Sequence, residues 1–228
     1  MIGFDGDDVI RTKSSTKTLL SQTFFTMFLG VLATAIASIY TYSSGLYIDM
    51  IAGGGYIGLC IAELAIALIF SLLFRKLSAT IVTLLFFGYS ILTGVTFSVL
   101  LAIYDITSIA YAFIASAAVF GALAYIGKNT DKDLTKLGTI LSVTLIIGIV
   151  LTLVNLFVGN TMLDIILNWI ILFIFMGFTV YDMNKLTHLA EMGYDDQNKL
   201  HIYGAMELYL DFINIFLRLL QIIARNRD

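Results

Sequence analysis

The sequence predicts an all-α, polytopic membrane protein with seven transmembrane helices, of which the last is central. Of the 228 residues, 59% are hydrophobic, against roughly 45–50% in soluble domains. Only 13% are charged, about half the usual share, so charged side chains are too few to cover a soluble domain of this size. Seven stretches also reach the length of about 20 apolar residues that a bilayer crossing requires. Secreted, disordered and nucleic-acid-binding classes are therefore excluded.

The seven predicted spans are separated by short connections. They cover residues 19–40, 51–73, 79–103, 106–126, 137–158, 162–183 and 202–224. The longest connection, 184–201, is too small to fold alone. We therefore expect a cytoplasmic tail over 1–18, a seven-helix transmembrane domain over 19–224 and a second tail over 225–228. The lipid bilayer is the expected environment, and the activity is expected to lie within or across it.

The orientation follows from the basic residues, which alternate between the two sides. They occur in the N-terminal segment and in the second, fourth and sixth connections, and are Arg11, Lys13, Lys17, Arg75, Lys76, Lys128, Lys132, Lys136, Lys185 and Lys199. Because short cytoplasmic segments carry the excess of Lys and Arg, the N-terminus is predicted to be cytoplasmic. Arg225 and Arg227 then lie outside if the seventh segment crosses fully, and a re-entrant seventh segment is the alternative.

Four carboxylates within the predicted spans stand out, namely Glu63, Asp182, Glu207 and Asp211, whereas Asp164 lies at the end of its span. Because a charged group in the hydrocarbon region is costly, each is a candidate functional residue. Glu63 lies near the middle of the second span, where it is either an ion ligand or proton relay, or a protonated packing residue. The single cysteine, Cys60, excludes an intrachain disulfide and a cysteine metal cluster.

The last span carries a polar stripe. Glu207, Asp211, Asn214 and Arg218 follow the spacing i, i+4, i+7, i+11 and share one helix face. Polar side chains inside a membrane face other helices rather than lipid. The seventh helix is therefore predicted to be central.

Asp182 and Asp211 are predicted to lie near each other, because the sixth and seventh spans are consecutive and antiparallel. Two neighbouring carboxylates in a low dielectric do not both ionise readily, so a proton is shared between them. The shared proton holds the two helices together, and its loss releases hard oxygen ligands suited to Ca²⁺. This pattern outlines a pH-gated cation pathway. The alternative for Asp182 is a local surface pair with Lys185, three residues on.

Two segments resemble the Bax inhibitor family, the transmembrane Bax-inhibitor-motif proteins of bacteria and eukaryotes. They are MGFTVYDMNKL at 176–186 and AMELYLDFINIFLRLL at 205–220, and AEL at 62–64 and RKLS at 75–78 support them. The resemblance implies seven helices with the last surrounded by the other six, in a bacterial plasma (inner) membrane. It also implies a pH-sensitive Ca²⁺ leak whose paired-aspartate sensor maps onto Asp182 and Asp211.

The resemblance further implies a basic counter-ion at the end of the second helix. Arg75 is the candidate, with Phe74 as the alternative occupant of that position. No cofactor is expected, since Ca²⁺ and protons are the species moved, with Ca²⁺ bound only transiently at Asp182 and Asp211.

Two other classes of membrane protein share part of this pattern. An intramembrane aspartyl protease also places Tyr-Asp on one helix and Asp on the next, but requires Gly-x-Gly-Asp and Pro-Ala-Leu segments. Here the second site reads Leu208-Tyr209-Leu210-Asp211 and the chain has no proline, so an enzyme is not expected. The other class is a non-conducting regulator that binds another membrane protein, such as a membrane protease.

Overall fold

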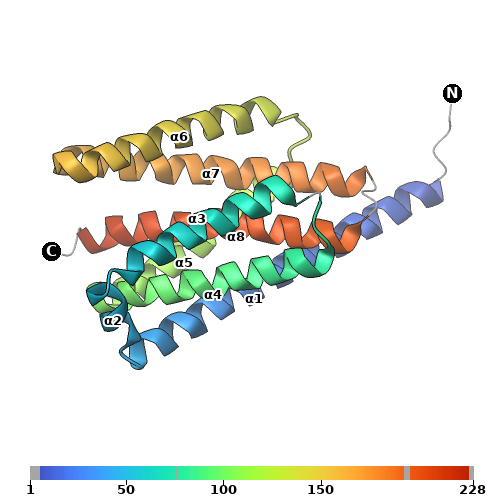
Figure 1. The fold of residues 1–228 in the computed structure, drawn as a ribbon. Helices are drawn as coiled ribbons and strands as arrows, with labels where there is room; N and C mark the ends of the chain where they lie inside the picture. The colour runs from blue at the N-terminus through green and yellow to red at the C-terminus, as the bar shows by residue number, and fades with distance from the viewer. Residues whose placement is uncertain (1–5, 75, 193–195, 226–228) are drawn as a thin grey trace. The chain divides into compact units, whose positions relative to one another are not determined.

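The computed structural model describes residues 6–74, 76–192 and 196–225, and it is helical through most of them (Figure 1). The helices within these ranges are α1 (Gly6–Ser43), α2 (Leu46–Ala52), α3 (Gly55–Leu73), α4 (Ala79–Ile103), α5 (Ile106–Lys128), α6 (Thr135–Val158), α7 (Thr161–Glu191) and α8 (Gln197–Arg225). By length and composition, six of them can cross a membrane: α1 from Ser15 onward, and α3 to α7. The chain is therefore an integral, multi-pass, all-helical membrane protein.

The last helix, α8, has 29 residues and is amphipathic. It is long enough to cross a bilayer, but its charged residues keep it outside the set of six apolar spans found among the described residues. A seventh span therefore stays a prediction.

The chain divides into two compact units. Unit 1 comprises Met1–Asp105 and Ala190–Tyr209, and unit 2 comprises Ile106–Leu189 and Leu210–Asp228. The division falls within α8, whose first half belongs to unit 1 and whose second half belongs to unit 2.

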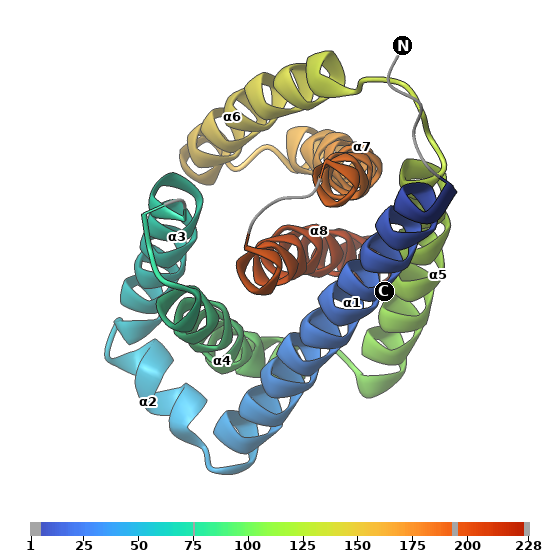
Figure 2. The same cartoon turned by 90° about the vertical axis from the view of Figure 1, so that its right-hand side faces the viewer.

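Unit 1 is built around a close contact between α1 and α4, which lie side by side in both views (Figures 1 and 2). A Cβ atom on Gly94 of α4 would lie 2.4 Å from the Thr34 carbonyl oxygen of α1, so only glycine allows this approach. Tyr209 of α8 is fully buried in the same unit, with its hydroxyl 2.6 Å from the Thr34 hydroxyl. Thr34 also donates to the Ser90 carbonyl at 2.8 Å. A polar contact thus ties three helices of unit 1 together.

Unit 2 contains α5, α6, α7 and the second half of α8. Figure 2 shows α6 and α7 next to each other, and Figure 1 shows that they run in opposite directions. A Cβ atom on Gly138 of α6 would lie 2.5 Å from the Tyr181 ring of α7. Glycine at this position lets the ring pack directly on the backbone of α6.

Helix positions follow the predicted spans, and α4 has the predicted limits. The helix α3 begins four residues later than the predicted second span, and five helices extend further than predicted: α5 and α6 by two residues each, and α1, α7 and α8 by more. The prediction ended the sixth span at 183 and began the seventh at 202, whereas α7 continues to Glu191 and α8 begins at Gln197. The extended parts are held by packing that hydropathy does not detect: Asn184 and Thr187 are buried, and the Lys199 ammonium lies 4.8 Å from the centre of the Phe74 ring. Likewise α1 begins at Gly6, within the predicted tail.

The first connection contains a helix that was not predicted. The seven-residue α2 follows Gly45 and is separated from α3 by Gly54, and both glycines have positive φ, 77° and 71°. Such backbone angles favour glycine and allow the chain to turn sharply at both ends of α2.

Candidate functional site

Asp182 and Asp211 both belong to unit 2 and are buried, with exposed fractions of 8% and 3%. They lie on α7 and on the second half of α8, which run antiparallel and side by side (Figures 1 and 2). The contact between these helices includes Asn168, whose amide donates to the Arg218 carbonyl at 3.3 Å. The structure therefore places two buried carboxylates on neighbouring helices of one unit.

The backbone around Asp182 is held between two helices. On one side, a Cβ atom on Gly127 of α5 would lie 2.4 Å from the Val180 carbonyl oxygen and 3.0 Å from the Met183 Cβ. On the other side, Tyr181 packs on Gly138 of α6. Asp182 therefore sits in a segment with little freedom to move unless α5 or α6 moves with it.

The same helix α5 also packs beside Asp211. The Phe212 ring makes edge-on contacts with Phe113 and Phe120 of α5, with ring centres 5.5 and 5.7 Å apart. These contacts are of the geometry that aromatic pairs prefer. Because α5 contacts the segments around both aspartates, it links their positions.

Beyond Asp182, polar side chains fix the end of α7 that was predicted to be cytoplasmic. Asn184 is buried and donates to the Thr130 carbonyl in the connection after α5, and Thr187 donates to the Met183 carbonyl at 2.8 Å. In the same connection, hydrogen bonds from the Thr135 hydroxyl and backbone N–H lower the pKa of the exposed Asp133 carboxyl, with His188 and Lys136 adding smaller effects. Sequence reasoning did not identify Asn184 as a structural residue.

The predicted polar stripe of α8 is divided between the two units. Glu207, in unit 1, accepts from the Tyr203 hydroxyl one turn earlier. In unit 2, Asn214 donates to the Leu210 carbonyl at 2.8 Å. Arg218 donates to the side-chain oxygens of Asn168 and Gln221, both at 3.4 Å.

Glu63 lies in unit 1, with its Oε1 2.7 Å from the Thr96 hydroxyl of α4. The proposed counter-ion, Arg75, lies outside the described residues. Within the described residues there is no group of three or more His, Cys, Asp or Glu side chains placed to bind a metal ion.

Asn168 and Thr96 are two further polar partners that sequence reasoning missed. Asn168 is buried in an otherwise apolar stretch of α7, and an amide inside a predicted span is a signal that could have identified it. Thr96 gives no such signal, because a threonine hydroxyl in a helix commonly bonds to its own backbone.

Comparison with known proteins identifies the family. The model of the family described as "Inhibitor of apoptosis-promoting Bax1" matches residues 16–228. The inner membrane protein YbhL of Escherichia coli (strain K12) is 37% identical over 228 residues, covering 97% of each chain. An uncharacterized protein of Deinococcus radiodurans is 36% identical over 221 residues, covering 96% of this chain and 94% of its own. An uncharacterized membrane protein of Streptococcus pyogenes serotype M1 is 36% identical over 173 residues, covering 75% of each chain.

The family match covers the segments around Asp182 and Asp211 that carried the resemblance. Together with the six membrane-spanning helices, it shows that this chain is a membrane protein of the Bax inhibitor family.

Proposed function

We propose that this protein is a pH-sensitive Ca²⁺ leak pathway, gated by a proton that Asp182 and Asp211 share. The observation that supports the proposal is the burial of both carboxylates on neighbouring helices of unit 2. A carboxylate within the membrane is energetically costly and therefore rare. Where one occurs, it commonly takes part in ion binding or proton transfer. The proposed activity is transport, and no catalytic step is part of it.

The gating step follows from electrostatics in a low dielectric. With one proton shared, the two carboxyl groups attract each other and α7 and α8 stay in contact. When that proton is lost, the two negative charges repel, and the site becomes a pair of hard oxygen ligands for Ca²⁺. A tenfold change in proton concentration is worth about 1.4 kcal/mol, which is enough to shift a helix equilibrium that is within a few kcal/mol of balance.

The packing around the two aspartates supports a coupled movement. Gly127 of α5 contacts the Val180 backbone beside Asp182, and Phe120 of α5 contacts Phe212 beside Asp211. A change in the separation of the carboxylates therefore also displaces α5. In this proposal the opening involves α5, α7 and α8 rather than the two aspartate side chains alone.

Ca²⁺ flux into liposomes that contain only this protein tests the proposal. We expect wild-type flux to vary with pH between 5 and 8, and Asp182→Asn or Asp211→Asn to flatten that dependence. Asp164→Asn is the matched control, because Asp164 lies on the same helix but is exposed, where it forms an ion pair with Arg225 at 2.8 Å. A purified protein without flux at any pH would contradict the proposal and favour a non-conducting regulator of another membrane protein.

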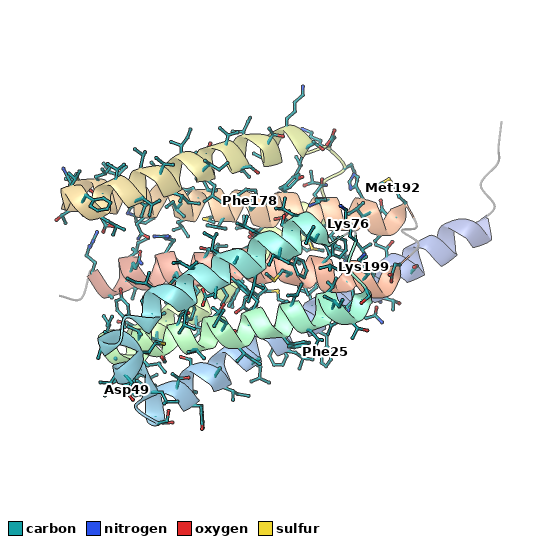
Figure 3. All side chains as sticks on the ribbon, viewed as in Figure 1. Phe25, Asp49, Lys76, Phe178, Met192 and Lys199 are labelled. Carbon is teal, nitrogen blue, oxygen red and sulfur yellow. The ribbon has the colours of Figure 1, made fainter. Side chains whose placement is uncertain are left out.

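We further propose that α8 is the seventh span, enclosed by the other six, and that the N-terminus is cytoplasmic. Full burial of Leu208, Ile215 and Leu220 along α8 supports an enclosed position. The distribution of charge supports the orientation: in unit 1, Asp49 lies at one end of the helices and Lys76 and Lys199 lie at the other (Figure 3). The name of YbhL as an inner membrane protein supports the same location for this chain.

Cysteine labelling from the two sides of the membrane tests this topology. Because Cys60 is exposed, the parent variant is Cys60→Ser. Single cysteines at Lys132 and Asn226 are expected to react from opposite sides. Reaction of both from the same side would replace the seventh span with a re-entrant segment.

A further inference from the structure

The first connection of unit 1 carries an apolar helix that the rest of the described chain leaves largely uncovered. None of the seven residues of α2 is buried, and Leu46, Ile48 and Ile51 are 51%, 57% and 49% exposed. Asp49 is the only charged residue of this helix. An exposed apolar surface of this kind marks a contact with a partner or with a membrane.

The level of α2 in the membrane follows from the length of its neighbour α3. With 19 residues, α3 is about 28 Å long, and the hydrocarbon layer of a bilayer is about 30 Å thick. Each end of α3 therefore lies close to a boundary between hydrocarbon and headgroups. The helix α2 ends three residues before α3 begins, and both views place it where α1 ends and α3 begins (Figures 1 and 2). It therefore lies at that boundary rather than in bulk water.

Contacts at both ends of α2 hold it in this place. The chain turns sharply at Gly45 and Gly54, which have positive φ, and the ring of Tyr47 stacks on Tyr42 of α1 with ring centres 5.2 Å apart. The helix also contacts α3 and α4, so it meets three helices of unit 1. Tyrosine is one of the side chains that membrane proteins concentrate at the boundary between lipid and water.

The outward surface of α2 has an apolar side and an acidic side. Each residue of an α-helix turns by about 100°, so Ile48 and Ile51 lie about 60° apart and form one face, the Ile48/Ile51 face. Asp49 lies about 100° from Ile48 and about 160° from Ile51. The helix can therefore turn its two isoleucines toward hydrocarbon while its carboxylate reaches water.

The lipid-facing surface of two membrane spans continues into this face. Ile39 and Tyr40 near the end of α1, and Ile57 near the start of α3, are exposed. Both helices can cross the membrane, so exposed apolar side chains along them contact lipid. Because α2 joins these two helices at their ends, the lipid that surrounds them also reaches the Ile48/Ile51 face. Phospholipid is therefore the occupant that this surface fits.

We propose that α2 is an interfacial helix whose Ile48/Ile51 face is embedded in one leaflet of the bilayer, where the acyl chains join the headgroups, while Asp49 faces water. Interfacial helices insert their apolar side about 5–10 Å into this region. Lipid contact thus anchors the connected ends of α1 and α3 at the membrane surface. This contact is separate from the aspartate pair and does not depend on whether the protein conducts Ca²⁺.

Tryptophan fluorescence in nanodiscs tests this placement, because nanodiscs open both membrane faces to solutes in the buffer. Trp169, the one tryptophan of the chain, is first removed with Trp169→Phe. Single tryptophans are then introduced with Ile48→Trp, with Ile51→Trp and, as the matched control on the acidic side of α2, with Asp49→Trp. Phe28→Trp, at an exposed side chain near the middle of the α1 span, is the reference for deep lipid contact.

Two kinds of quencher are compared: acrylamide in the buffer, and phosphatidylcholine brominated near the carbonyl end or near the middle of its acyl chains. Since an interfacial helix lies at a shallow depth, bromines near the carbonyl end should quench Ile48→Trp and Ile51→Trp at least about twofold more than bromines near the chain middle. Phe28→Trp should show the reverse order. Acrylamide should quench Asp49→Trp at least about twofold more than either isoleucine variant.

Equal quenching of Ile48→Trp and Asp49→Trp by acrylamide would overturn the proposal, because α2 would then be a solvated loop. Protection of Ile48→Trp from both acrylamide and brominated lipid would also overturn it, and would assign this face to a protein surface such as a second copy of the chain.

A nitroxide attached to Ile48→Cys, in a Cys60→Ser background, supplies a second readout if a tryptophan variant fails to fold. Its spin relaxation should be accelerated more by oxygen, which concentrates in lipid, than by a water-soluble nickel chelate. The opposite order would rule out the lipid contact.

Discussion

Replacing Gly127 with alanine should destabilise unit 2, because the new methyl group has no room. Its Cβ atom would lie 2.4 Å from the Val180 carbonyl oxygen, which belongs to the backbone of α7 and cannot rotate away. Overpacking of this kind costs about 1–3 kcal/mol. Alanine also stabilises a helix by about 1 kcal/mol relative to glycine, and this gain offsets part of the destabilisation caused by the clash.

Gly121 supplies the control that removes the propensity effect. It lies on the same helix, α5, and a Cβ atom there meets nothing within 4 Å. Gly121→Ala should therefore leave the free energy of unfolding unchanged or raise it by up to about 1 kcal/mol. The difference between the two variants isolates the cost of the clash, and we expect it to be about 1–3 kcal/mol.

Unfolding of both variants can be followed in detergent micelles by the fluorescence of Trp169, which is the one tryptophan of the chain and lies on α7 in unit 2. Gly127→Ala should unfold at lower denaturant concentration than Gly121→Ala. Equal stabilities of the two variants would refute the close packing of α5 against the segment that carries Asp182.

Three further predictions concern single side chains. Tyr209→Phe removes the contact with Thr34 and should lower stability by about 1 kcal/mol in thermal unfolding, whereas Tyr40→Phe, on an exposed side chain, should change it by less than about 0.5 kcal/mol. Asn168→Leu removes both contacts with Arg218 and should cost about 1–3 kcal/mol, and a stability equal to wild type would remove Asn168 from the α7–α8 contact. Because hydrogen bonds from Thr135 lower the pKa of Asp133, its carboxyl should titrate by NMR below the value in a peptide. These hydrogen bonds stabilise the folded protein at pH values above the ordinary pKa of an aspartate, and this stabilisation is lost as the pH falls through the lowered pKa of Asp133. A titration midpoint equal to that of a peptide would contradict the Thr135 contacts.

Hydropathy predicted the membrane helices because lipid imposes a single requirement, a long apolar stretch, that a sequence displays directly. The limits of α4 followed from this rule alone. The extensions of α7 and α8 did not, since Asn184 and Lys199 are held there by contacts with distant residues. The short α2 also escaped prediction, because seven residues carry little periodicity and the turns at Gly45 and Gly54 determine its limits.

Candidate site residues could be identified from the sequence where the side chain is one that is energetically costly to place within a membrane. Asp182, Asp211 and Glu63 were singled out because a carboxylate within a span is rare. Their hydrogen-bonded surroundings could not be predicted in the same way. Thr34 and Tyr209 are 175 residues apart in sequence, and a hydroxyl pair at that separation leaves no local pattern.

The double variant Asp182→Asn/Asp211→Asn shows whether one proton shared by the two carboxyl groups controls Ca²⁺ flux. Flux should be measured in liposomes from pH 5 to 8 for the wild type, each single variant and the double variant. Because the two carboxyls titrate as one unit, each single change should flatten the pH dependence and the double change should add little more. A double variant whose Ca²⁺ flux still follows pH like the wild type would rule out the shared proton as the gate.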